Sequence, residues 1–207
     1  MVATLGRLVP RGAAGSLEVR IVSVDLGRGM PPVALADANG KSFDSRYDIA
    51  DQPLLVMFMC NHCPYVKHVA PIIGELSREW AEQGVVIVAI NSNDPDRYAE
   101  DAYAEMPKFA ERHDWGFPYL IDRDQDVARS FGAVCTPDTF LFDQQGRLAY
   151  RGQIDDSRPG NEIPVTGESL RAAVEAVLSG EPVSADQQPS VGCSIKWKSA
   201  PTSPALD

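Results

Sequence analysis

The motif Cys60-Asn-His-Cys63, followed directly by Pro64, constrains this chain more than any other feature. The residues before it, Leu55–Met59, form an unbroken apolar run, which predicts a strand buried on both faces. Apolar residues follow it at the 3,4,3,4 spacing of an amphipathic helix: Val66, Val69, Ile73, Leu76 and Trp80. The cysteines therefore lie at a helix N-terminus, where unpaired N–H groups and the helix dipole favour a thiolate. Because the thiolate is the reactive form of cysteine, the motif predicts a redox-active dithiol.

Two other interpretations of the motif stay open, a metal site and a pair of inert core cysteines. A structural zinc site needs further ligands, typically a second CxxC or an HxxxH pair, and the sequence contains neither. A c-type haem motif needs His after the second cysteine, where Pro64 stands. The strand–CxxC–helix context therefore favours the redox dithiol.

The segments around the motif predict a parallel sheet. Residues 85–90 form a second continuously apolar strand, and a helix over 64–83 joins it to the first. Two such strands joined by a helix form a right-handed parallel βαβ unit. Upstream we expect a half-buried strand over 17–24 and a small hairpin over 33–43.

The second half of the chain continues this alternation of helices and strands. We expect a helix that Asp94 caps; Pro107 interrupts it, and a second piece runs to about His113. A strand over 117–121 and a helix capped by Asp124 should follow. The domain should end with a hairpin over 139–151 and a helix over 166–180.

Composition and length predict one globular α/β domain. The 207 residues divide into a flexible N-terminus (1–16), the domain (17–180) and an extended C-terminal tail (181–207) rich in Pro, Ser, Asp and Gln. The net charge of −10 argues against nucleic acid or an anionic membrane as a partner. We find no transmembrane run and no signal peptide, and four cysteines are too few for a disulfide scaffold, so we expect a cytoplasmic protein.

The order of these elements, with Thr136-Pro137 leading into a hairpin, resembles the thioredoxin fold over about residues 30–180. The N-terminal strand and hairpin extension, and the extra helix and strand over 97–121, resemble the branch that includes TlpA/ResA-type reductases and peroxiredoxins. The strings around Cys60 and around Cys193 are similar to an uncharacterised bacterial group of that branch. The resemblance implies a central mixed sheet flanked by helices.

The resemblance also assigns roles to individual residues. Cys60 would attack a substrate disulfide and Cys63 would resolve the mixed disulfide. Pro137 matches the cis-proline that faces the dithiol and binds the substrate backbone, and Thr136 matches the residue before it. The buried acid of thioredoxin would fall at position 54, where Leu54 stands, so its role is unfilled or moved.

The chain also departs from the peroxiredoxin pattern Pro-x-x-x-Thr-x-x-Cys. Taking Cys63 as the peroxidatic cysteine, Val56 stands at the Pro position and Cys60 at the Thr position. We therefore do not expect a typical peroxiredoxin mechanism.

Three further residues have two interpretations each. His62 either stabilises the Cys60 thiolate, as the His in the same slot of DsbA implies, or is an exposed loop residue. Cys135 is either an auxiliary thiol beside the dithiol or a small packing residue. Cys193 is either a resolving thiol or a buried docking residue beside Trp197. Three acidic residues lack any paired arrangement and are interpreted as surface charge: Glu105, Asp155 and Asp156.

These observations together predict a thiol–disulfide oxidoreductase without a bound cofactor. Its substrates would be protein or small-molecule disulfides, another dithiol would reduce it, and peroxide reduction is a variant of the same chemistry. The alternative is a thioredoxin-fold copper-binding protein that uses the dithiol with a histidine, either His62 or the distal His113.

Overall fold

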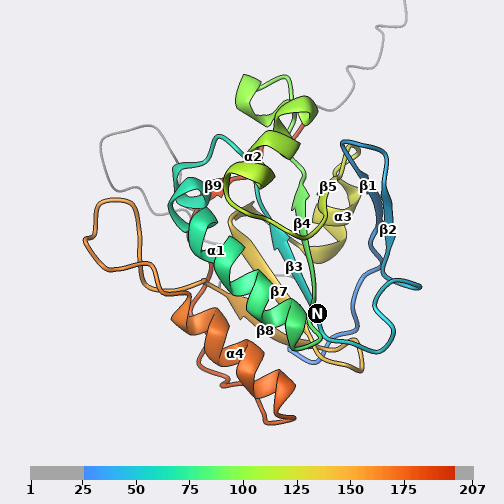
Figure 1. The fold of residues 1–207 in the computed structure, drawn as a ribbon, viewed down its shortest axis with the longest axis vertical. Coiled ribbons are helices and arrows are strands. Elements are labelled where there is room, and N and C mark those ends of the chain that lie inside the picture. Colours follow the sequence, from blue (N-terminus) through green and yellow to red (C-terminus); the bar gives the residue numbers. More distant parts are fainter. Residues whose placement is uncertain (1–25, 199–207) are drawn as a thin grey trace, which may run out of the picture.

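The computed structural model describes residues 26–198, which form a seven-stranded sheet flanked by helices (Figure 1). The strand order is β2-β1-β5-β4-β3-β7-β8. The strands are β1 (Ala34–Asp37), β2 (Ser42–Asp44), β3 (Leu54–Phe58), β4 (Val86–Asn91), β5 (Tyr119–Ile121), β7 (Asp138–Phe142) and β8 (Leu148–Gly152). β3, β4 and β5 are parallel and the other pairs are antiparallel, so the sheet is mixed as expected.

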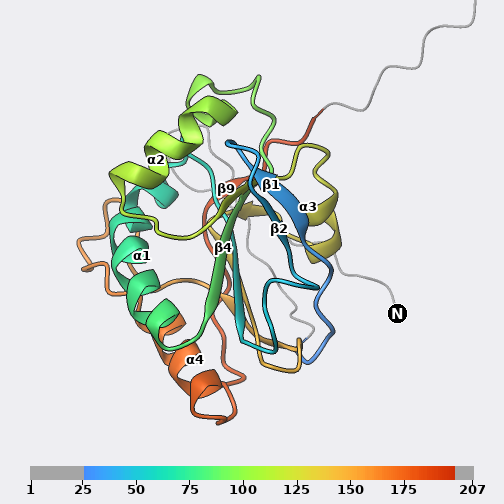
Figure 2. The same cartoon turned by 45° about the vertical axis from the view of Figure 1, so that its right-hand side comes forward.

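Helices cover both faces of this sheet. α1 (Pro64–Glu82), α2 (Met106–Arg112) and α4 (Glu168–Leu178) lie on one side, and α3 (Asp126–Phe131) lies on the other (Figure 2). Alternate residues of β3 enter the two cores: Leu55 and Met57 face α1, while Val56 and Phe58 face α3. Burial on both faces explains why the strand sequence is apolar without interruption.

The predicted βαβ unit is confirmed. β3 is buried throughout, β4 runs parallel to it, and α1 joins them. Pro64 lies in the first turn of α1, where its missing N–H needs no partner. The predicted hairpins are also confirmed, β1 with β2 and β7 with β8.

The prediction of a helix that begins at Asp94 is wrong. Two short 3₁₀ helices, η1 (Ala99–Asp101) and η2 (Tyr103–Glu105), replace it, and Ala102 between them has an extended backbone with φ −55° and ψ 137°. α2 begins only at Met106, so Pro107 lies in its first turn rather than interrupting a helix. The physical reason lies in Asp101, whose carboxylate is held by the backbone of the cysteine motif.

Two interpretations of acidic residues are also corrected. The N–H groups of Val127 and Ala128 in α3 donate to the carboxylate of Asp122, not to Asp124. Asp155 is buried, because its carboxylate accepts from the backbone of Thr166 and Gly167 ahead of α4.

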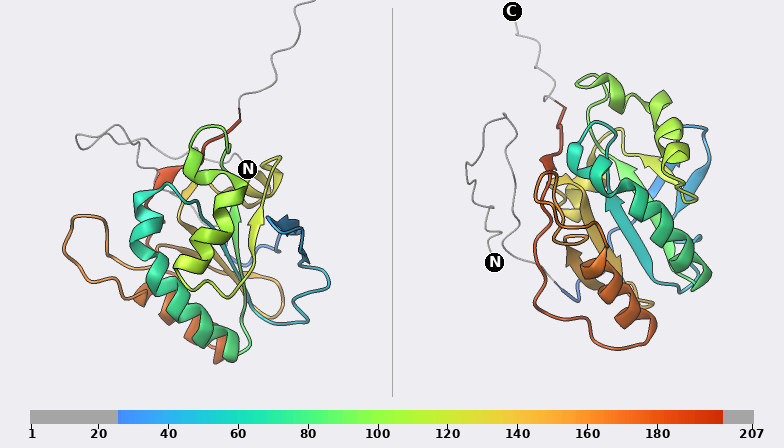
Figure 3. Two further views of the ribbon diagram at one scale, coloured as in Figure 1. Left: turned by 45° about the horizontal axis from the view of Figure 1, so that its top comes forward. Right: turned by 60° about the vertical axis from the view of Figure 1, so that its left-hand side comes forward.

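The described part of the C-terminal tail packs back onto the domain. Its strand β9 (Cys193–Ser194) pairs antiparallel with β6 (Cys135–Thr136) in a separate two-stranded sheet. Figure 3 shows this segment beside the beginning of α1. The strand expected over 17–24 and the segments 1–16 and 199–207 lie outside the described residues. Within residues 26–198, no helix combines the length and the apolar composition needed to cross a bilayer.

Candidate active site

The two cysteines of the motif lie where β3 turns into α1, as the sequence predicts. Cys60 follows the end of β3, and Cys63 is the N-cap residue of α1. Both residues are fully buried, with 0% exposure. The dithiol is therefore formed as expected, but it is covered.

The Thr136–Pro137 peptide bond is cis and lies against the dithiol, as predicted. The hydroxyl Oγ1 of Thr136 lies 3.1 Å from the Cys60 sulfur, and the Cys63 thiol donates to the Thr136 carbonyl oxygen at 3.1 Å. One residue therefore contacts both sulfurs, although 73 residues separate it from Cys63 in the sequence.

The two thiols have different electrostatic surroundings. Burial, the neighbouring Cys63 thiolate and the charge of Asp101 raise the pKa of Cys60 well above its ordinary value. The neighbouring thiols of Cys193 and Cys60 favour the charged form of Cys63 and lower its pKa. The N-cap position of Cys63 favours the same charge through the helix dipole. The expectation that Cys60 carries the stabilised thiolate stays a prediction, because the two buried thiols titrate as a pair.

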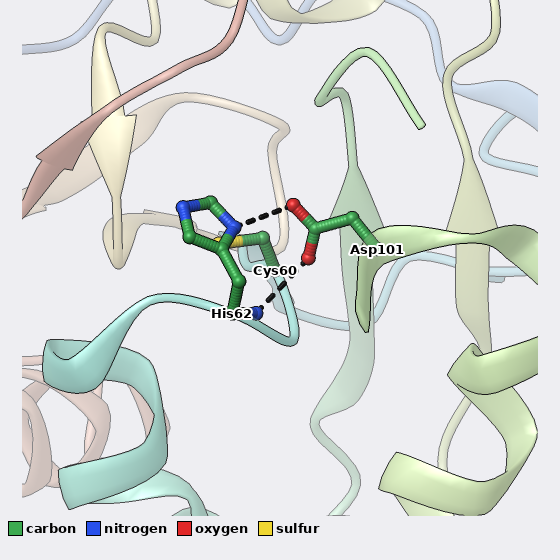
Figure 4. A group of neighbouring side chains, drawn as sticks. All are labelled: Cys60, His62 and Asp101. Atoms are coloured by element: carbon green, nitrogen blue, oxygen red, sulfur yellow. Dashed lines mark hydrogen bonds and ion pairs between the residues drawn. The ribbon is translucent and has the colours of Figure 1, made fainter. Parts of the chain in front are cut away.

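Asp101 is the residue of the site that sequence reasoning missed. Its Oδ1 accepts from the backbone N–H groups of Asn61 at 2.8 Å and His62 at 3.0 Å. Its Oδ2 accepts from Asn93 Nδ2 at 2.8 Å and lies 2.5 Å from His62 Nδ1 (Figure 4). Burial raises the pKa of Asp101, but the hydrogen bonds from His62 and Asn93 outweigh it and keep the pKa below its ordinary value.

A buried acid thus lies beside the dithiol, although not at the position that the resemblance left unfilled. Leu54, at the position of the thioredoxin acid, is fully buried in β3. Asp101 brings a carboxylate to the motif from the segment after β4 instead. No local sequence pattern identifies Asp101, since nothing distinguishes it from the other acidic residues of a polar loop.

The ring of His62 faces Asp101 and also stacks on Tyr98, with the ring centroids 3.8 Å apart. The partner of His62 is therefore the carboxylate of Asp101. The interpretation of His62 as an exposed loop residue is wrong, since its side chain is only 8% exposed. The tuning of Cys60 by His62 stays a prediction. Next to it, the side-chain oxygen of Asn61 accepts from the hydroxyl of Tyr119 at 3.0 Å, which also fixes the motif.

The two remaining cysteines lie on the paired strands β6 and β9. Cys193 is opposite Thr136 in the register and belongs to the same buried cluster as Cys60 and Cys63. Cys135 is fully buried, and its thiol contacts the carbonyl oxygen of Pro137 at 3.5 Å. The structure thus brings Cys193 beside the dithiol.

The donor atoms of Cys60, His62 and Asp101 lie within 4.8 Å of one another, so these three residues are the candidate ligands for a metal ion. Both carboxylate oxygens of Asp101 are already engaged by hydrogen bonds. His113 is not in this group, because it follows α2 and packs against the ring of Phe109, with centroids 4.6 Å apart. No observation favours the copper-binding alternative.

Comparison with known proteins identifies the family. The family model described as "AhpC/TSA family" matches residues 26–151, more than half of the chain. The chain belongs to the AhpC/TSA family. This match ends before α4 and β9, so it includes the dithiol and the cis-proline but not Cys193.

Two solved structures cover almost the whole described domain. An uncharacterised conserved protein from Geobacillus kaustophilus is 47% identical, with a TM-score of 0.86 over 90% of this chain and 100% of that one. A hypothetical protein from Sinorhizobium meliloti 1021 is 43% identical, with a TM-score of 0.84 over 86% of this chain and 98% of that one.

A curated relative carries a functional name. The thiol-disulfide oxidoreductase ResA of Halalkalibacterium halodurans is 28% identical over 114 residues, which are 55% of this chain. The chain spans only 60% of the length of that relative. The AhpC/TSA match, the ResA likeness and the mixed sheet between helices confirm the predicted thioredoxin-like fold and its TlpA/ResA- and peroxiredoxin-like branch.

Proposed function

We propose that this protein is a thiol–disulfide oxidoreductase whose redox centre is the pair Cys60 and Cys63. The observation that carries the proposal is that both sulfurs contact Thr136, beside a cis-proline and at the N-terminus of α1. Membership of the AhpC/TSA family and the likeness to ResA support it. Its substrates are protein or small-molecule disulfides, and the reductant is another dithiol.

The electrostatics of the pair suggest an order of attack. The Cys63 thiolate attacks one sulfur of the substrate disulfide, forms a mixed disulfide and releases one substrate thiolate. Cys60 then loses its proton and attacks the Cys63 sulfur, which releases the second substrate thiol and leaves a Cys60–Cys63 disulfide. The substrate gains two electrons, and an external dithiol returns them to the protein. This order is the reverse of the one that the resemblance implies, and it is supported by the N-cap position of Cys63 and by the Asp101 carboxylate close to Cys60.

Three supporting residues have proposed roles. The Thr136 hydroxyl favours ionisation of Cys60 when that thiol attacks. The backbone at Thr136–Pro137 is the proposed contact for the substrate chain, and β9 already pairs with Thr136 in the manner of an extended segment. His62 with Asp101 holds the motif in place and sets the charge beside Cys60.

The test is an exchange assay on the reduced protein with oxidised glutathione and with insulin, run beside a peroxide assay. Wild-type protein is expected to turn over with dithiothreitol as reductant, whereas Cys60→Ser and Cys63→Ser lose turnover. Cys135→Ser is the matched control, since it removes a buried thiol from the neighbouring strand. Retained turnover in both Cys60→Ser and Cys63→Ser would refute the proposal, and turnover with peroxide alone would make the protein a thiol peroxidase.

The order of attack has its own test. Cys193 is replaced by Ser in both variants compared, because its thiol lies beside the dithiol. Cys60→Ser/Cys193→Ser is expected to accumulate a glutathione adduct on Cys63, and Cys63→Ser/Cys193→Ser is expected to accumulate far less on Cys60. The opposite pattern of adducts would restore the order implied by the resemblance.

The cytoplasm is part of the proposal, supported by cysteine usage that does not suit a disulfide scaffold. Fractionation of cells that express the full chain tests it.

A further inference from the structure

The C-terminal strap, defined as residues 190–198, places a third thiol in the redox centre. In the register of β6 and β9, Cys193 lies opposite Thr136. Directly opposite residues of an antiparallel pair project on the same face. Because the Thr136 hydroxyl faces Cys60, Cys193 projects toward the dithiol, and all three cysteines belong to the same buried cluster. Thr136 therefore has Cys63 on one side, through its carbonyl oxygen, and Cys193 opposite it in the strand pair.

The strap is also what lies over the dithiol. Gly192 sits so close to the substrate-side loop that a Cβ there would be 2.1 Å from the Thr136 carbonyl oxygen and 3.1 Å from Pro137 Cδ. Only glycine permits this approach, since real Cβ contacts do not come below 3.0 Å. Cys60 and Cys63 have 0% exposure and Cys193 has 6%, so the strap must leave before a disulfide substrate can reach the site.

Hydrogen bonds on both sides of Cys193 hold the strap in this position. The N–H of Ile195 donates to the Val134 carbonyl at 3.0 Å, and Ile195 is buried against the α3 side of the sheet. The carbonyl of Lys196 accepts from the Asp94 N–H at 2.8 Å. On the other side of Cys193, the hydroxyl of Ser190 donates to Gly152 at 2.8 Å. The covered state is therefore an ordered arrangement of the chain.

We propose that Cys193 is a third redox thiol, which attacks Cys63 in the oxidised dithiol and moves the disulfide from Cys60–Cys63 to Cys63–Cys193. This step rests on the proposed function, because that function forms the Cys60–Cys63 disulfide that Cys193 attacks. The S–S bond between Cys60 and Cys63 breaks, and a bond between Cys63 and Cys193 forms. The proton that leaves Cys193 ends on Cys60, and no net oxidation or reduction takes place.

The exchange has a structural consequence. A Cys63–Cys193 bond ties the strap to the beginning of α1 and keeps the site covered, with Cys60 returned to the thiol. The oxidised protein then excludes further disulfide substrates until its reductant opens the Cys63–Cys193 bond. The strap acts as a redox-controlled cover of the same site.

The choice of Cys193 rather than Cys135 follows from the strand geometry. Side chains alternate between faces along a strand, so Cys135 projects away from the face that Thr136 presents to Cys60. Its thiol contacts the Pro137 carbonyl instead. Cys135 therefore serves as a matched control, a buried thiol on the paired strand that the proposal leaves uninvolved.

The test uses the full chain with Cys60→Ser, in which the first disulfide cannot form. Diamide, a small oxidant that takes two electrons from a pair of thiols, is added at one equivalent, and disulfides are mapped by mass spectrometry of peptides. The expected product is the Cys63–Cys193 disulfide, in at least tenfold excess over any other, and Cys60→Ser/Cys135→Ser gives the same product. A Cys63–Cys135 bond, stable single-thiol adducts or three remaining free thiols would each overturn the proposal.

A second measurement follows the exchange in the protein with all four cysteines. After oxidation by one equivalent of oxidised glutathione, both Cys60–Cys63 and Cys63–Cys193 disulfides are expected, and Cys193→Ser yields only the first. A protein that turns over in the exchange assay but never contains Cys63–Cys193 would refute this inference and leave the proposed function intact. A protein without turnover whose Cys60→Ser variant still forms Cys63–Cys193 would refute the function and not the position of Cys193 beside the dithiol.

Discussion

Replacing Gly192 with Ala is expected to open the C-terminal strap selectively. The added methyl group would lie 2.1 Å from the Thr136 carbonyl oxygen and 2.6 Å from the carbonyl carbon. Both atoms belong to the backbone beside the cis-proline, which the following strand β7 holds in place through its pairing with β3. The strap must therefore shift, because its neighbour cannot move without distorting the sheet.

The size of the effect follows from the cost of overpacking. Inserting a methyl group into a well-packed position costs about 1–3 kcal/mol, and about 1.4 kcal/mol corresponds to a tenfold change in an equilibrium constant. The ratio of closed to open strap should then fall by about 5- to 150-fold. When the strap opens and closes faster than a reagent reacts, the rate of labelling at the dithiol rises by the same factor.

Alkylation with iodoacetamide measures this change, with each cysteine quantified by peptide mass spectrometry. Gly116→Ala is the matched control, because a Cβ at Gly116 meets no atom within 4 Å. Urea unfolding of both variants establishes that they remain folded. Unchanged labelling of Cys60 and Cys63 in folded Gly192→Ala would show that the strap does not control access, and equal acceleration in Gly116→Ala would show that the effect is not specific.

Two further predictions concern the residues that support the dithiol. Asp101→Asn keeps one acceptor oxygen for the backbone N–H groups but turns an NH2 group toward His62 and Asn93, so urea unfolding should show a loss of about 2–4 kcal/mol at neutral pH. The pKa of Asp101 is lowered in the folded state, so the ionised carboxylate stabilises the fold above the ordinary carboxylate pKa of about 4. This stabilisation is lost as the pH falls through the pKa of the folded state. A difference in unfolding free energy between wild type and variant that stays constant below pH 3 would contradict this. Thr136→Val removes the hydroxyl that favours the Cys60 thiolate, so the pKa of Cys60 should rise and its alkylation midpoint should move to higher pH, and a midpoint that stays in place or falls would count against that contact.

The covered dithiol explains why two properties of this protein must be measured separately. Exchange assays report the dithiol only in molecules whose strap is open, because Cys60 and Cys63 have no exposed surface when it is closed. Labelling rates report the opening itself. Comparing the two in Gly192→Ala separates poor access from poor reactivity.

Local patterns in the sequence determined the centre of the fold. An apolar run predicts β3 because a strand buried on both faces has no solvent-facing polar side. The 3,4 spacing of apolar residues after Pro64 predicts α1 because such residues fall on one face of a helix. The position of Cys60 and Cys63 between them follows directly. The Thr136–Pro137 contact was predictable only through the resemblance to thioredoxin, and the structure places it as expected.

The segment around Asp101 shows where local patterns fail. Its spacing and the Asp94-Pro95 step favour a helix, yet the chain adopts two 3₁₀ turns separated by the extended Ala102. The carboxylate of Asp101 satisfies two backbone N–H groups of the cysteine motif, 39 and 40 residues earlier in the chain. A buried N–H without a partner is costly, so this tertiary contact outweighs the local preference for a helix.

The sequence by itself determined which two cysteines form the dithiol, and only the tertiary structure decided what surrounds them. Composition describes residues after 180 as an extended polar tail, and nothing in that stretch indicates where it lies. The position of Cys193 beside the dithiol depends on the pairing of β9 with β6, strands more than fifty residues apart in the sequence. Such pairings are set by which edge of the folded domain is left unpaired and by the room that Gly192 leaves beside Thr136, and neither exists until the chain has folded.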